Sequence, residues 1–189
     1  MGAPCLTVPE PASTLPRAMT PPRIAELALA AADYVRQSVN MDLDGSVESL
    51  AFVDHYVSRV GGVSDPVLAL VAASIGAYFG EVAIRHMGGA WELTGDDPAG
   101  WTVALEAAPL RFHPVAMAAE AIRQADIEDY DASIGAPPEL EGPLMEALAA
   151  AGPVDAEYFY SLTGRLETLE HAAAILTELR RQGEEQRRN

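Results

Sequence analysis

Two glycines inside a helical segment constrain the fold of this chain more than any other feature of its sequence. They lie in GAYFGEVAIRHMGGAW, residues 76–91. A helix is predicted from Asp65 as its cap and Pro66 in its first turn to Met87, where a Gly-Gly pair follows. Each interior glycine costs about 1 kcal/mol relative to alanine, so close packing must offset that cost. We therefore expect this helix to be the central element of the fold.

The predicted helix has distinct faces when it is wound at about 100° per residue. One face is large and apolar: Leu68, Val71, Ala72, Ile75, Phe79 and Val82. The neighbouring face holds only small residues: Ala69, Ala73, Gly76, Gly80 and Ala83. Because small side chains let a second backbone approach closely, both faces are expected to be buried.

A third face carries four polar residues within about 60° of one another: Ser74, Tyr78, Glu81 and Arg85. One interpretation makes Glu81 and Arg85 an i,i+4 ion pair, with Tyr78 lying between core and solvent. The other places Glu81 in a groove beneath Trp91, where it binds a cation, caps a partner's backbone or acts as a base. We take Tyr78, Glu81, Arg85 and Trp91 as candidate partner- or ligand-binding residues and assign no catalytic residue.

The remaining sequence pattern predicts further helices and a small sheet. Helices are expected at 22–39, from an N-cap at Asp44 or Ser46 to residue 60, at 114–124, at 143–151 and at 155–182. Two segments rich in β-branched and aromatic residues, 90–93 and 101–112, flank a turn-rich stretch and predict an antiparallel pair. The fold class is therefore a mainly helical α+β domain with a small antiparallel sheet packed on the central helix.

The domain boundaries follow from composition. Residues 1–22 contain six prolines and are expected to be a flexible arm. Residues 23–182 are expected to form a single α+β domain, and residues 183–189 a charged tail. In the 155–182 helix, apolar residues recur in alternating steps of four and three, which is the spacing of a packing seam. This helix either docks on the body or forms a homodimer with another copy.

The charge of the chain bears on its partners. There are 12 Lys+Arg, all of them arginine, against 28 Asp+Glu, for a net charge of -16. An acidic surface repels phosphates, so nucleic acid is not an expected partner. A basic protein partner or a cation fits this charge better. The arginine- and alanine-rich, lysine-free composition is typical of a GC-rich bacterial genome.

The sequence also bears on location. Cys5 is the single cysteine, which excludes an internal disulfide. The first 22 residues lack the basic-then-apolar order of a signal peptide, and no later run of uninterrupted apolar residues reaches the roughly 18 that span a membrane. We expect a cytoplasmic protein that does not bind membranes.

Catalytic and metal-binding motifs are missing from the sequence. The four histidines are isolated, and there is no paired-cysteine spacing, nucleophile elbow, phosphate-binding loop or dinucleotide-binding fingerprint. The stretch DLDG at residues 42–45 begins like a calcium loop, but the later ligands do not follow, which favours N-capping. We therefore expect no metal and no cofactor.

Four short motifs together resemble a set of functionally uncharacterised bacterial domains. They are SVESLAFVD at 46–54, IGAYFGEV at 75–82, GGAW at 88–91 and a strand leading into FHP at 112–114. The shared pattern is S-x-x-S-L, G-x-Y-x-G-E-V and G-G-x-W, over roughly residues 40–125. The resemblance implies a common α+β unit and points to Tyr78, Glu81 and Trp91 without giving them a role.

Two functional hypotheses remain at this point. The first is a non-catalytic cytoplasmic protein-binding domain of the regulatory-adaptor or immunity (toxin-neutralising) type, because the chain is acidic, lacks catalytic motifs and ends in a seam-bearing helix. The alternative is a small enzyme or ligand-binding protein that uses Glu81 in a groove under Trp91. In that case Asp44, His55 or His113 would supply further groups.

Overall fold

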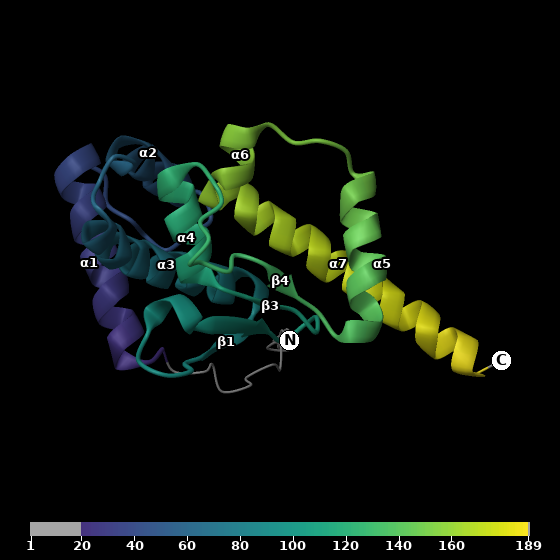
Figure 1. Ribbon diagram of the computed structural model, residues 1–189. Coiled ribbons are helices and arrows are strands. Elements are labelled where there is room, and N and C mark those ends of the chain that lie inside the picture. Colours follow the sequence, from purple (N-terminus) through teal and green to yellow (C-terminus); the bar gives the residue numbers. More distant parts are fainter. Residues whose placement is uncertain (1–19, 189) are drawn as a thin grey trace, which may run out of the picture.

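The computed structural model describes residues 20–188, so most of the predicted arm, including Cys5, and the last residue lie outside the described residues. Within residues 20–188 the chain forms seven α-helices, one short 3-10 helix and one four-stranded antiparallel sheet (Figure 1). The helices are α1 (Pro22–Val39), α2 (Leu50–Val60), α3 (Asp65–Met87), α4 (Pro114–Arg123), α5 (Pro138–Ala150), α6 (Ala156–Tyr160) and α7 (Leu162–Arg188). The strands are β1 (Gly89–Glu92), β2 (Thr102–Leu105), β3 (Arg111–Phe112) and β4 (Ile134–Gly135). The mainly helical α+β class predicted from the sequence is confirmed.

Helix α3 lies at the centre of the fold, as its glycines predict. Every residue from 71 to 80 is buried, and α1 and α4 both pack along it. A Cβ on Gly76 would lie 2.5 Å from the Cα of Val115 in α4, and a Cβ on Gly80 would overlap the indole ring of Trp91. The small-residue face therefore allows the backbone of α4 and the Trp91 side chain to approach α3 closely.

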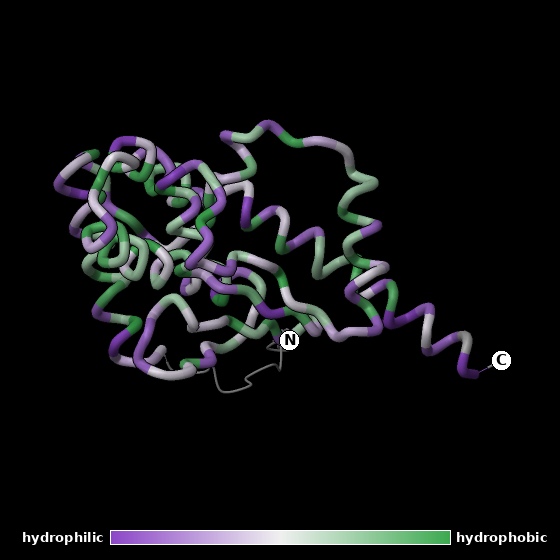
Figure 2. Tube along the Cα trace, in the orientation of Figure 1, coloured by the Kyte–Doolittle hydropathy of each residue, from purple (hydrophilic) through white to green (hydrophobic). Residues whose placement is uncertain are grey.

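Helix α4 supplies the second surface of the close contact with α3. Nine of its ten residues are buried, and four of them are alanines. The small side chains of α4 face the small-residue face of α3, so the two helix backbones pack closely together. Figure 2 shows hydrophobic residues gathered where α1 to α4 and the sheet meet, and mostly hydrophilic residues at the free end of α7.

Helix α3 is also apolar and long enough to cross a membrane, by length and composition alone. Most of it is buried inside the domain, and the core helix of a soluble protein passes the same test.

The sheet covers one side of α3 and has the strand order β1-β2-β3-β4. Strands β1 and β2 pair from Gly89 opposite Leu105 to Glu92 opposite Thr102. Phe112 of β3 is fully buried and meets the ring of Phe79 in α3 edge-on, with 6.0 Å between ring centroids. The antiparallel sheet over 90–112 was predicted, but β4 was not, because a two-residue strand carries no period that a sequence pattern can reveal.

Three of the predicted helices differ from the observed ones. Helix α2 begins at Leu50, and Asp44 and Ser46 instead accept hydrogen bonds within the preceding turn, from the amides of Ser46 and Ser49. Helix α5 begins at Pro138, with Pro143 inside it, and not near residue 143. The helix predicted at 155–182 is two helices that meet at Ser161, and α7 continues to Arg188 through the residues expected to form a tail.

A carboxylate from α2 fixes the start of α7. Asp54 accepts hydrogen bonds from the amide of Leu162 at 2.7 Å, the amide of Thr163 at 3.1 Å and the Thr163 hydroxyl at 2.6 Å. It therefore acts as an N-cap supplied by another helix. Burial raises the pKa of Asp54, although these hydrogen bonds oppose the shift.

The leucine seam of α7 docks on the body of its own chain. Leu162, Leu166, Leu169 and Leu176 are all buried. Beyond them the helix projects past α5 into solvent (Figure 1). A homodimer through this region stays a prediction.

The close contact between α3 and α4 gives a direct test. Gly76→Ala should lower the free energy of unfolding by about 1–3 kcal/mol, because the new methyl group would overlap the α4 backbone. Gly183→Ala is the matched control, since Gly183 is also helical but nothing lies within 4 Å of its Cβ position. Urea denaturation should show Gly183→Ala to be neutral or slightly stabilising. Equal effects of the two substitutions would contradict the packing described here.

Candidate functional site

The four residues selected from the sequence lie in two separate places. Tyr78 and Arg85 contact the turn that precedes α2. The Tyr78 hydroxyl accepts a hydrogen bond from the amide of Gly45 at 2.9 Å and lies 2.6 Å from the Ser49 hydroxyl. Arg85 Nη1 donates to the Asp44 carbonyl at 2.9 Å. Both side chains therefore fasten this turn to α3.

Tyr78 is buried, and Arg85 packs closely against Gly45. Burial raises the pKa of the Tyr78 hydroxyl, so it stays protonated. Gly45 has φ +74°, and a side chain there would overlap the Arg85 guanidinium. The described residues show no ion pair between Glu81 and Arg85, so the first interpretation of this face was wrong. The reason is that Arg85 instead donates a hydrogen bond to the Asp44 carbonyl, in the turn before α2.

Glu81 lies beneath Trp91, as the second interpretation predicted. Its Oε1 accepts a hydrogen bond from the Trp91 indole at 2.9 Å, and its Oε2 accepts one from the Thr20 hydroxyl at 2.7 Å. Within the described residues, no hydrogen bond joins the Glu81 carboxylate to Tyr78 or to a strand amide. Because both carboxylate oxygens accept hydrogen bonds from within the domain, Glu81 holds β1 and the start of α1 against α3.

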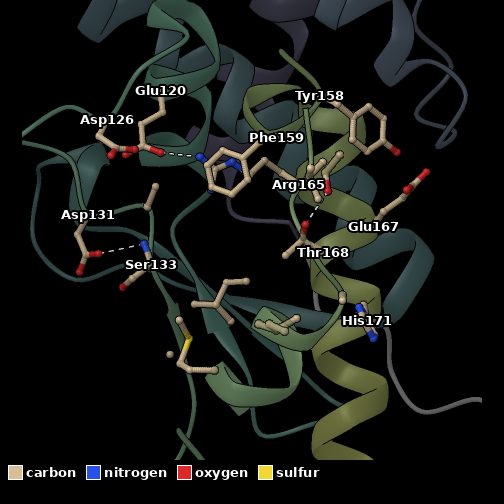
Figure 3. A pocket seen from close by; sticks show the side chains of 18 of the residues that line it. Glu120, Asp126, Asp131, Ser133, Tyr158, Phe159, Arg165, Glu167, Thr168 and His171 are labelled. Atoms are coloured by element: carbon tan, nitrogen blue, oxygen red, sulfur yellow. Dashed lines mark hydrogen bonds and ion pairs between the residues drawn. The ribbon is translucent and has the colours of Figure 1, made fainter. Parts of the chain in front are cut away.

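A concave surface lies elsewhere, between the segment 126–135, α5, α6 and α7 (Figure 3). It is a cleft of about 1100 Å³. None of Tyr78, Glu81, Arg85 and Trp91 lines it. Its apolar floor and walls include Ile127, Ile134, Met145, Leu148, Val154 and Phe159. Met145, Val154 and Phe159 are 57%, 58% and 42% exposed, which is unusual for large apolar side chains that share one cleft.

A buried ion pair closes the inner end of the cleft. Arg165 Nη2 of α7 lies 2.6 Å from Glu120 Oε2 of α4, and the two side chains are only 9% and 8% exposed. The Arg165 guanidinium stacks on the Phe159 ring, 4.3 Å from its centroid. Burial raises the pKa of Glu120 and lowers that of Arg165, with their mutual attraction opposing both shifts. Arg165 Nε is buried and has no hydrogen-bond partner.

Carboxylates surround the apolar floor. The six that line the cleft are Glu120, Asp126, Glu128, Asp131, Glu141 and Glu167, against the one guanidinium of Arg165. The formal balance is therefore 6 - 1 = 5 negative charges, with His171 neutral. Within residues 20–188 no group of three His, Cys, Asp or Glu side chains is close enough to hold a metal ion. The carboxylates are thus spread along the cleft and not gathered at one point.

Two rim carboxylates are held in place by hydrogen bonds. Asp126 accepts a hydrogen bond from the Tyr160 hydroxyl at 2.9 Å. Asp131 accepts one from the amide of Ser133 at 3.0 Å, and the hydrogen bonds from Ser133 hold the pKa of Asp131 below its ordinary value. Asp131 therefore stays ionised at neutral pH and presents negative charge at the edge of the cleft.

Sequence reasoning missed this cleft. From its sequence, the acidic, proline-bearing segment 126–143 is interpreted as a connector, and α5 was predicted to start too late. Two signals were available: the density of acids in that segment and the adjacent aromatics Tyr158, Phe159 and Tyr160. Neither signal reveals that α7 lies beside this segment, because that placement depends on tertiary contacts.

The predicted role of Glu81 has a direct test. Glu81→Gln should lower the free energy of unfolding by about 1 kcal/mol, because an amide cannot accept both the indole and the hydroxyl hydrogen bonds as the carboxylate does. Glu48→Gln, at an exposed site, should change it by far less. Thermal unfolding followed by tryptophan fluorescence measures both. Indistinguishable values would mean that Glu81 is not part of the packing beneath Trp91.

Comparison with known proteins does not add to this geometry. No family model matches the chain, and no curated protein or solved structure is significantly similar to it. The resemblance based on the S-x-x-S-L, G-x-Y-x-G-E-V and G-G-x-W pattern therefore stays an expectation.

Proposed function

We propose that this chain is a non-catalytic cytoplasmic protein-binding domain, of the regulatory-adaptor or toxin-neutralising type, and that the cleft between α5 and α7 is its binding site. The observation that carries this proposal is the exposure of Met145, Val154 and Phe159 within one cleft. Exposed apolar side chains gathered at one concave surface and rimmed by polar residues are typical of protein-interaction sites.

The construction of the cleft supports the same proposal. Among the residues of α5, only Leu144 is fully buried. Leu140 and Leu148 add partial packing on the core. A wall held by so few contacts can adjust to an incoming surface at low cost. The opposite wall, α7, is held firmly by Asp54 and by the Glu120–Arg165 pair. One rigid wall and one adaptable wall suit the binding of a macromolecular segment.

The alternative, an enzyme or ligand-binding protein based on Glu81, has less support. Both oxygens of Glu81 accept hydrogen bonds from Trp91 and Thr20, and the side chain does not line the cleft. A catalytic base needs a substrate atom within hydrogen-bonding distance. The geometry around Glu81 favours a role in packing.

The test uses a photocrosslinking amino acid placed at Met145, in cells that naturally produce the chain. Leu29 of α1 is the control position, because it is 68% exposed and does not line the cleft. Crosslinking from position 145 should yield a discrete protein adduct that position 29 does not yield. The partner identified by mass spectrometry should then bind the purified wild-type chain directly.

Substitutions complete this test. Met145→Asp and Val154→Asp should each weaken binding of that partner at least tenfold, and Leu29→Asp should leave it unchanged. A partner that binds all three variants equally, or identical adducts from both crosslinking positions, would refute the cleft as the binding site. All three sites are exposed, so the substitutions are expected to preserve folding.

A further inference from the structure

The two edges of the cleft carry the same sign of charge. Asp126 and Asp131 lie along one edge, and Glu167 of α7 lies on the other (Figure 3). The surface between them is formed largely by apolar side chains, including Ile134 and Leu148. A segment that fills this cleft would therefore present an apolar stripe to the floor and cations to both edges.

The electrostatics of the cleft discriminate between partner segments. The single guanidinium among the lining residues, that of Arg165, is already paired with Glu120. The five net negative charges then repel an acidic segment and attract a basic one. A neutral apolar segment would be stabilised by contacts with the apolar floor of the cleft but not by its charged edges. The cleft is thus selective for positive charge as well as for apolar surface.

A second, independent observation points to an occupant. Arg165 is 8% exposed and lines the cleft, yet its Nε has no hydrogen-bond acceptor. A buried donor without a partner costs about 1–3 kcal/mol. Phe159 covers the guanidinium and is itself 42% exposed. If Phe159 turns outward, a main-chain carbonyl of a bound segment can accept from Nε and remove that cost.

We propose that the cleft binds a basic amphipathic segment of a partner protein, with an apolar stripe flanked by arginine or lysine. This inference rests on the proposed function and specifies the chemistry of its partner. An amphipathic helix meets the requirement directly, because its apolar stripe and flanking charges recur every three to four residues. The end of this chain's own α7 fits less well, since Arg181 already pairs with Glu178 and Glu185.

The first experiment uses three synthetic peptides of 18 residues and the full chain. One is an amphipathic helix of leucine and lysine, the second has glutamate in place of lysine, and the third is a scrambled leucine–lysine sequence of the same composition. Fluorescence anisotropy should show that the leucine–lysine helix binds at least tenfold more tightly than either of the others. Its binding should weaken severalfold between low and high salt, because the rim charges are screened.

The second experiment places the binding in the cleft. Glu128→Gln combined with Glu167→Gln should weaken the leucine–lysine peptide at least fivefold. Glu26→Gln combined with Glu48→Gln removes the same charge from exposed positions outside the cleft and should leave binding within twofold of wild type. Equal losses in the two double variants would show a nonspecific attraction to an acidic protein and overturn the inference.

The remaining outcomes separate this inference from the proposed function. Equal binding of the leucine–glutamate helix, or no binding of any peptide, would overturn the inference that the cleft binds a basic segment. The proposed function would then still stand if a natural partner crosslinked at Met145 depends on Met145 and Val154. Self-association that disappears when residues 180–189 are deleted would make a second copy the occupant and would also overturn the inference. Sedimentation velocity measures that self-association.

Discussion

The buried ion pair between Glu120 and Arg165 is the interaction on which the proposed binding cleft depends. It is the charged link between α4, which is embedded in the core, and α7, which forms a wall of the cleft. Two charges that are more than nine-tenths buried are tolerated only as a pair, because an isolated buried charge is very costly. The pair therefore fixes where α7 crosses the core, and with it the position of the inner end of the cleft. Asp54 fixes the same helix at its first turn.

The two parts of the molecule differ in how closely they are packed. The part from α1 to α4 is a closely packed scaffold, in which Gly76 lets α4 approach and Glu81 and Tyr78 fasten neighbouring segments to α3. The part after α4 is more open, and it carries most of the exposed apolar surface of the cleft. Binding surfaces need exposed side chains, whereas scaffolds need buried ones. The polar face of α3, which the sequence singled out, belongs to the scaffold.

Local sequence patterns predicted those features of the fold that depend on interactions between residues close together in the chain. The bounds of α1 and α3, the small-residue face of α3 and the position of Glu81 beneath Trp91 all follow from helical periodicity and from glycine and proline signals. The cleft depends on contacts between distant segments: Glu120 with Arg165, Asp54 with Leu162, and β3 with β4. No pattern within a few residues reports such contacts. The helix predicted at 143–151 starts at Pro143, because proline is favoured in the first turn of a helix, whereas in the structure Pro143 lies inside α5.

A double-mutant cycle between Glu120 and Arg165 tests the central claim most directly. Unfolding free energies are measured for Glu120→Gln, Arg165→Met and the double variant. Each single substitution should cost about 3–5 kcal/mol, because Arg165→Met leaves a buried carboxylate unpaired and Glu120→Gln a buried guanidinium. The double variant should cost less than the sum of the singles by about 1–3 kcal/mol. Strictly additive effects, each below about 1 kcal/mol, would show that the pair does not hold α7 to the core and would contradict the account.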